Sequence, residues 1–92
     1  MTPDKAYLLA LTNGFTEKLQ EIACRDSNIA YHFARKVAGA DIEKCQTVAC
    51  KHPIYALWFA QEIRGADIDY CKSRMGIYLD QYLEVQMIES LK

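Results

Sequence analysis

The sequence has little of what marks the specialised protein classes. Its 92 residues include only four Gly and two Pro, and the formal net charge is −1. The low Gly and Pro content excludes collagen-like and low-complexity chains, and 51% hydrophobic with 25% charged residues is typical of globular domains. A near-neutral charge gives no general attraction to a polyanion such as nucleic acid. We therefore expect one small globular domain.

Long apolar segments are missing as well. The longest uninterrupted apolar run is far shorter than the roughly 18 residues that a membrane-spanning helix needs. Asp4 and Lys5 interrupt the first residues, so we expect no signal peptide. These absences predict a cytoplasmic protein that has no membrane partner.

Signatures of catalysis are absent too. The chain contains no Gly-x-Gly-x-x-Gly, no Walker loop, no Gly-x-Ser-x-Gly and no His-Glu-x-x-His. Cys50 and His52 could be imagined as a nucleophile and its base, but residues two apart point to different sides of a helix. Without a Cys-x-x-Cys, only His32 and His52 could complete a zinc site with the cysteines. We expect a non-enzyme that holds no cofactor and no metal.

What the chain does contain is an internal repeat with a period of 26 residues. Segment 30–45 recurs as 56–71, with Ala, Phe, Ala, Gly, Ala, Asp, Ile and Cys at matched positions. Segment 17–25 aligns with 43–51 at the same offset, so a more diverged copy comes first. Such a fixed period is typical of stacked repeat arrays. We predict an all-α fold, a short α-solenoid of three helix-turn-helix repeats of 26 residues (1–26, 27–52 and 53–76) plus a C-terminal capping helix (77–91), in a single domain 1–92.

Each copy has the pattern of two helices joined by a short turn. Shared apolar residues fall at i, i+3, i+4 and i+7, as in the stripe from Ala30 to Val37, and this spacing fits one face of a helix but not a strand. In the first copy the 26-residue offset puts Tyr7, Leu8 and Leu11 on the buried stripe.

The motif Gly-Ala-Asp-Ile, at residues 39–42 and 65–68, marks the turn between the two helices. Gly adopts the left-handed conformation that often ends a helix, and the Asp can accept hydrogen bonds from the first free amides of the next helix. Thr16 is the nearest capping residue in the first copy, and Ser27 could cap the helix that follows. Pro53 suits the first turn of a further helix. We expect seven helices in all.

The last of these helices differs from the repeats. Its apolar residues could close the last apolar face of the array: Tyr78, Tyr82, Leu83, Ile88 and Leu91. This atypical helix could also pair two chains, so a structural or self-associating role is one hypothesis for the protein.

The four cysteines fall at matched positions of the repeats, Cys24 with Cys50 and Cys45 with Cys71. Matched positions on stacked helices lie about one helix spacing apart, roughly 8–10 Å. This separation exceeds the Cα distance that a disulfide tolerates. We interpret all four as reduced, buried, space-filling thiols.

The helix face opposite the shared stripe is the predicted binding surface. Around a 3.6-residue helix, His32 and Arg35 lie roughly opposite the stripe, as do Trp58 and Gln61 in the next copy. These positions differ between copies while the stripe is kept, as expected where packing sets no constraint. Trp58 is the main anchor candidate because exposed Trp is common at interfaces. The alternative is that Trp58 folds under the C-terminal helix.

Two further residue sets belong to this prediction. In the first copy, the 26-residue offset makes Ala6 and Leu9 the equivalents of His32 and Arg35. A modest basic strip could also form on the central unit, although a solvated helix face has the same composition; its residues would be Arg25, Arg35, Lys36, Lys44 and Lys51.

Residues 30–46 and 55–68 resemble a short tandem repeat of phage and bacterial proteins, whose pattern is Tyr-Ala-x-x-Phe-Ala followed by Gly-Ala-Asp-Ile. The resemblance covers 27–75 well and 1–26 loosely. It implies a phage or mobile-element setting, in which small domains often block a host protein, as anti-CRISPR proteins do.

The leading hypothesis is a non-catalytic protein-binding module that inhibits a host protein complex, such as a CRISPR effector involved in host defence. The alternative is nucleic-acid binding, because two helices joined by a tight turn superficially match a helix-turn-helix unit. The acidic balance and the absence of a basic recognition helix oppose this alternative.

Overall fold

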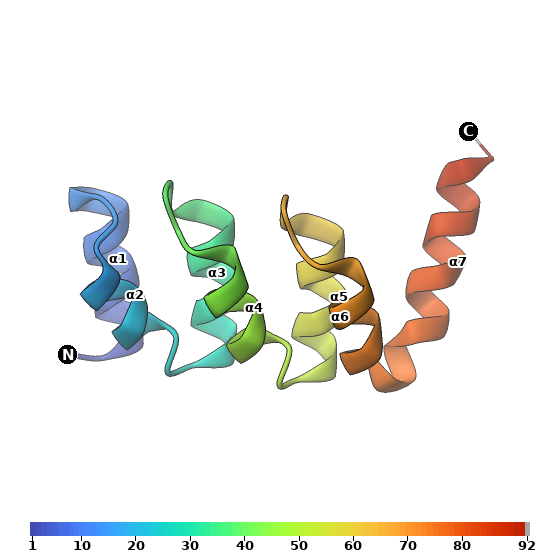
Figure 1. The fold of residues 1–92 in the computed structure, drawn as a ribbon, viewed down its shortest axis with the longest axis horizontal. Coiled ribbons are helices and arrows are strands. Elements are labelled where there is room, and N and C mark those ends of the chain that lie inside the picture. The colour runs from blue at the N-terminus through green and yellow to red at the C-terminus, as the bar shows by residue number, and fades with distance from the viewer. Residues whose placement is uncertain (92) are drawn as a thin grey trace.

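The computed structural model describes residues 1–91, which form helices joined by short turns (Figure 1). The elements are α1 (Pro3–Asn13), α2 (Glu17–Ala23), α3 (Ser27–Lys36), α4 (Ile42–Ala49), α5 (Pro53–Glu62), α6 (Ile68–Arg74), the 3₁₀ turn η1 (Gly76–Tyr78) and α7 (Leu79–Ser90). No strand occurs over this range. The predicted all-α class and the seven α-helices are therefore confirmed.

The first six helices form three pairs. α1 packs on α2, α3 on α4, and α5 on α6, and successive pairs touch through α1 with α3 and through α3 with α5. The pairs stand in a row along the longest dimension of the molecule, whose extents are 42 × 25 × 16 Å. In Figure 1, α1, α3 and α5 form the rear layer, and α2, α4 and α6 lie in front of them.

The turns inside the second and third pairs have the same conformation. Asp41 and Asp67 each accept a hydrogen bond from the main-chain amide three residues further on, at 3.2 and 3.1 Å. Gly39 and Gly65 have φ values of +88° and +91°, the region that Gly adopts without strain. In the first pair Thr16 caps α2 through the Leu19 amide. These predicted caps are confirmed.

One predicted cap is wrong. Asp26, and not Ser27, precedes α3 and accepts a hydrogen bond from the Ile29 amide at 3.0 Å. A carboxylate in this position also complements the positive end of the helix dipole. Ser27 is the first residue of α3, and its hydroxyl donates to the Val48 carbonyl at 2.9 Å, which ties α3 to α4.

The core is built from small residues at the centre of α1, α3 and α5. Ala6, Ala30 and Ala56 are all fully buried at matched positions. Alanine lets neighbouring helices approach closely, since the helix spacing depends on the side chains at the contact. Phe33 and Phe59 are also fully buried, and the Phe33 ring packs edge-on against Phe15, with 6.3 Å between the ring centroids.

The first helix is buried in a different register from the one predicted. Ala6 and Ala10 lie in the core, whereas Leu8 and Leu11 are 59% and 45% exposed. The assignment of Leu8 and Leu11 to the buried stripe is therefore wrong, although Tyr7 does pack against the core.

The reason is the length of the first turn. Residues 14–16 connect α1 to α2, whereas the longer segment 37–41 connects α3 to α4. This difference of two residues moves α1 relative to α2, so α1 matches α3 at an offset of 24 residues while α2 matches α4 at 26. At the shorter offset Ala6 matches Ala30, and Tyr7 matches Tyr31.

Buried glutamines join each helix pair to the next. Gln20 in α2 accepts a hydrogen bond from the Asp41 amide, and Gln46 in α4 accepts one from the Asp67 amide, both at 2.7 Å. Both glutamines are buried, and a buried amide group without such a partner would be costly. Because the two Asp residues cap the starts of α4 and α6, each bond fixes the start of a helix in the following pair.

The C-terminal helix covers less of the array than predicted. The chain turns at Gly76, whose φ is +55°, and passes through η1 into α7. Tyr82 is buried, but Leu83, Ile88 and Leu91 are exposed, so the prediction that these three close the apolar face is wrong. The reason is that α7 leans away from the helix pairs after η1, so only its beginning reaches them (Figure 1).

The register of α1 can be tested by stability. We expect Ala10→Leu to lower the free energy of unfolding by about 1–3 kcal/mol, because added methylenes overfill a packed core. Leu8→Ala should change it by less than about 0.5 kcal/mol, as at other exposed positions. Urea denaturation followed by circular dichroism measures both. The reverse order would mean that the 26-residue register is right for α1.

The glutamine bonds give a second prediction. Gln46→Leu should lower the free energy of unfolding by about 1–3 kcal/mol, because the Asp67 amide loses its buried acceptor. The matched control is Gln86→Leu on an exposed position of α7, which should stay within about 0.5 kcal/mol of the parent. Equal stability of the two variants in urea denaturation would contradict a structural role for Gln46.

Candidate protein-binding face

The predicted binding residues lie on the outward side of the rear layer. His32, Arg35 and Lys36 belong to α3, and Trp58 and Gln61 belong to α5, which packs beside it. His32 is half-buried and the other four are exposed. Residues three and four apart on a helix share one side, so α3 and α5 each present their set on the same side of the layer.

Leucines complete this surface on α1. At the 24-residue offset, Leu8 and Leu11 take the positions of His32 and Arg35, so the predicted equivalents Ala6 and Leu9 are wrong. The recurrence of Ala-Tyr at 6–7 and 30–31 is the sequence signal for this offset. We call the full set the outer face: Leu8, Leu11, His32, Arg35, Lys36, Trp58 and Gln61.

Aromatic rings run in a continuous series across α1, α3 and α5. The distances between ring centroids are 6.2 Å for Tyr7–His32, 5.0 Å for His32–Tyr31, 5.9 Å for Tyr31–Trp58, 5.5 Å for Trp58–Tyr55 and 5.9 Å for Tyr55–His52. The tilted and edge-to-face arrangements are those that aromatic pairs prefer. The series crosses both junctions between helix pairs, and it places His32 and Trp58 on either side of Tyr31.

Trp58 is held in place yet accessible. Its indole packs against Tyr31 and Tyr55, and 39% of its surface is exposed. Of the two alternatives for Trp58, the structure therefore supports exposure on the outer face. A ring that neighbours already hold loses little conformational freedom on binding, which favours affinity.

Tyr31 links the aromatic series to the charges of the outer face. It is only 4% exposed. Burial raises the pKa of Tyr31 because its phenolate would lose solvation, while the nearby Arg35 charge opposes this shift and Glu62 adds to it. The hydroxyl is therefore neutral at physiological pH, and Arg35 lies close enough to interact with it.

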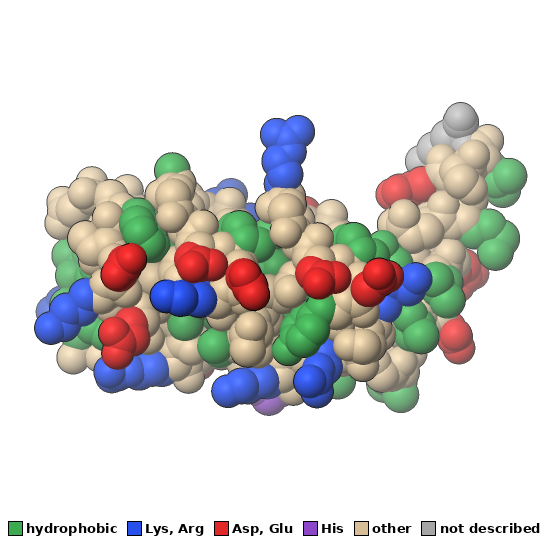
Figure 2. Space-filling model, in the orientation of Figure 1, with side chains coloured by type: hydrophobic (Ala, Val, Ile, Leu, Met, Phe, Trp, Pro, Cys, Tyr) green, Lys and Arg blue, Asp and Glu red, His purple; other side chains and the backbone are tan. Residues whose placement is uncertain are grey.

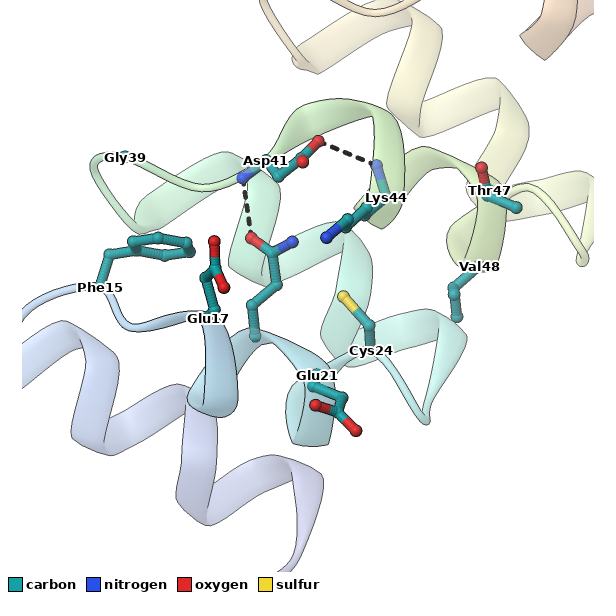
Figure 3. Close-up of a pocket in the computed structure, with 10 residues that line it drawn as sticks. Phe15, Glu17, Glu21, Cys24, Gly39, Asp41, Lys44, Thr47 and Val48 are labelled. Carbon is teal, nitrogen blue, oxygen red and sulfur yellow. Dashed lines mark hydrogen bonds between the residues drawn. The ribbon is translucent and has the colours of Figure 1, made fainter.

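The front layer carries a different kind of surface. A groove of about 740 Å³ opens between α2 and α4 (Figure 3), and the equivalent groove between α4 and α6 has about 380 Å³. Acidic side chains lie in a row across this layer (Figure 2). The exposed acidic residues of α2, α4, α6 and their caps are Glu17, Glu21, Asp41, Glu43, Asp67 and Asp69.

The cysteines lie close together in pairs that the sequence comparison did not consider. All four thiols are free, and the Sγ atoms of Cys24 and Cys45 are 3.6 Å apart, while those of Cys50 and Cys71 are 3.8 Å apart. Cys45, Cys50 and Cys71 are buried as expected, but Cys24 is only half-buried and lines the larger groove. The expectation of four fully buried thiols is thus wrong for Cys24.

Among residues 1–91, no three His, Cys, Asp or Glu side chains are grouped so that they could bind a metal ion. The His52 ring packs against Tyr55. Over the same range, no helix is both long enough and apolar enough to cross a bilayer.

Comparisons with protein families, with curated proteins and with solved structures give no match. The function therefore has to be inferred from the chemistry of the surfaces. Of these, the outer face combines an exposed Trp and an exposed Arg, two residue types that are enriched at protein interfaces, with exposed leucines beside them.

Proposed function

We propose that this chain is a non-catalytic protein-binding module, in which three helix pairs stack as a short α-solenoid and the outer face binds a protein partner. The observation that carries the proposal is Trp58, a fixed indole with 39% of its surface exposed in the middle of an aromatic series. Trp is among the residues most enriched at the energetic centres of interfaces.

The solenoid arrangement is supported by the matching geometry of the two junctions, one between the first and second helix pairs and one between the second and third. The turns at Gly39 and Gly65 match within a few degrees, and the Gln20 and Gln46 bonds have the same length. In a stacked array each unit contacts its neighbours through such matched interfaces, which leaves an extended outer surface free for binding.

The chemistry of the outer face varies along the array, which supports a role in recognition. Leu8 on α1, His32 on α3 and Trp58 on α5 occupy matched positions, whereas the buried alanines beneath them are identical. A partner that fits this face would offer an apolar pocket to the indole and an acidic group opposite Arg35, since Arg pairs well with carboxylates.

The resemblance of the repeat to phage and bacterial proteins extends the proposal to the partner. In that setting the bound protein is a host complex in the cytoplasm, such as a CRISPR effector, and binding inhibits it. The module would act by occupying a surface, because it carries no catalytic motif.

Nucleic-acid binding is the alternative, and it gives a separate prediction. The row of acidic side chains on the front layer repels phosphate (Figure 2), and the outer face continues from Arg35 and Lys36 to the neutral Gln61 and the acidic Glu62. We expect no shift of duplex DNA in a gel at low salt. Binding that weakens steeply as salt is added would favour the alternative.

The proposed face can be tested by substitution. Affinity capture from a bacterial host lysate, followed by mass spectrometry, identifies proteins that the parent chain retains. We expect Trp58→Ala to weaken binding of such a protein about 30-fold or more, the effect of losing an interface anchor of about 2 kcal/mol. Arg35→Glu should weaken it as well, because the substitution reverses the charge offered to the partner.

Matched controls separate this face from general surface effects. Ile77→Ala removes an 87% exposed apolar side chain outside the outer face, and Lys51→Glu reverses an exposed charge between α4 and α5. Both should bind like the parent. Circular dichroism checks that every variant remains helical. Unchanged binding by Trp58→Ala and Arg35→Glu would exclude the outer face as the binding surface.

A further inference from the structure

The two cysteine pairs stand at the two junctions between helix pairs. Cys24 follows α2 of the first pair and faces Cys45 in α4 of the second, while Cys50 follows α4 and faces Cys71 in α6 of the third. Both pairs are separated by 21 residues along the chain. The same thiol–thiol contact is therefore repeated at each junction.

We propose that these contacts are two built-in disulfide sites, Cys24–Cys45 and Cys50–Cys71, through which an oxidant covalently joins each helix pair to the next. The Sγ atoms already lie 3.6 and 3.8 Å apart. A disulfide needs about 2.05 Å, so the sulfurs must approach by roughly 1.5–2 Å, a shift within the reach of side-chain rotation and small backbone movement.

The two sites differ in access. Cys24 is half-buried and lines the 740 Å³ groove, and Figure 3 shows its side chain there together with that of Lys44. Cys50 and Cys71 are 2% and 0% exposed, so an oxidant reaches them only after local opening. The Cys24–Cys45 site should therefore react first.

Protonation favours Cys24 as the attacking thiol within the first site. When both thiols are protonated, Cys24 donates to Cys45. Loss of the Cys24 proton reverses this bond, and the Cys45 thiol then stabilises the thiolate, which lowers the pKa of Cys24 and raises that of Cys45. Cys24, the more exposed residue of the pair, is therefore the one whose thiol becomes nucleophilic.

The oxidant we propose is a small-molecule disulfide such as oxidised glutathione. The Cys24 thiolate attacks one of its sulfurs, the S–S bond breaks, and one small thiol leaves as a thiolate that takes up a proton. Cys45 then loses its proton, attacks the Cys24 sulfur of the mixed disulfide and expels the second small thiol. Two protein thiols are oxidised, and one small disulfide is reduced to two thiols.

Double variants isolate each site. Cys50→Ala/Cys71→Ala keeps only the Cys24–Cys45 pair, and Cys24→Ala/Cys45→Ala keeps only the Cys50–Cys71 pair. After incubation of the folded chain with oxidised glutathione, intact-mass spectrometry should find a monomer that has lost two hydrogen atoms in each variant. The Cys24–Cys45 pair should react about tenfold faster or more, since the second site needs an opening step.

The matched control keeps two thiols at equivalent positions of successive repeats, which stacking places about one helix spacing apart. Cys45→Ala/Cys71→Ala retains Cys24 and Cys50, the equivalent positions of successive repeats, and should form no intramolecular disulfide. It should accumulate instead as a glutathione adduct on Cys24. Intramolecular closure in this control as fast as in the paired variants would overturn the proposal, as would a stable glutathione adduct in the variant that keeps Cys24 and Cys45.

Stability gives a second readout that does not depend on reaction rates. Because each bond joins two folded neighbours, the oxidised Cys24–Cys45 variant should melt about 10 °C or more above its reduced form. Circular dichroism should show equal helix content before and after oxidation. A lower melting temperature or a loss of helix on oxidation would mean that the junction cannot accommodate the bond, and the proposal would fail.

Discussion

A hydrogen bond between a buried glutamine and the main-chain amide of a helix-capping Asp in the next pair sets how successive helix pairs are arranged. The side chain of Gln20 accepts a 2.7 Å hydrogen bond from the Asp41 amide, and that of Gln46 accepts an equal bond from the Asp67 amide. The bonded amide belongs to the same residue whose carboxylate caps the helix. One residue thus closes a turn within its own pair and fixes the position of the pair before it, so any change in the angle between pairs would break a buried bond.

This constraint explains why the two layers of the molecule have different characters. The front layer holds the glutamines, the caps and the thiols, and its residues are tied to each other across the junctions. The rear layer is held by small alanines, which only need to let the helices approach. Its outward positions take no part in the junction bonds of the front layer, and there the chain changes from Leu8 to His32 to Trp58.

Local features could be predicted from the sequence, whereas features that depend on spacing between helices could not. The caps at Thr16, Asp41 and Asp67 involve only residues three apart, so the sequence pattern is sufficient. Helical periodicity alone predicts that His32 and Trp58 lie on the side opposite the buried stripe. The same periodicity does not find the exposed leucines of α1. The turn between α1 and α2 is two residues shorter than the next, so the repeat offset changes for α1 and not for α2.

The cysteines show the same limit more clearly. Sequence repeats relate equivalent positions, here Cys24 with Cys50, and equivalent positions in a stack are always one full step apart. Contacts across a junction join positions that are not equivalent, because the end of one helix meets the side of the next. Cys24 and Cys45 are 21 residues apart, a separation that no self-alignment at 26 residues reveals.

The junction chemistry also explains why the row of helix pairs has two different ends. At each junction the earlier pair contributes a glutamine and a cysteine, and the later pair contributes an Asp amide and a second cysteine. In the first pair, Leu19 occupies the position of Cys45 and Cys71 in the later pairs. The first pair therefore has no thiol that could contact a pair before it.

At the other end, Lys72 takes the place of Gln46, and Gly76 takes the place of Cys50. The third pair therefore makes these contacts with the second pair, but it has neither the hydrogen-bond acceptor nor the thiol to make them with a fourth. The chain turns instead at Gly76, where the positive φ directs it into η1 and α7. The row of helix pairs therefore ends where the glutamine and the cysteine that contact a following pair are missing, and the chain changes direction at the same place.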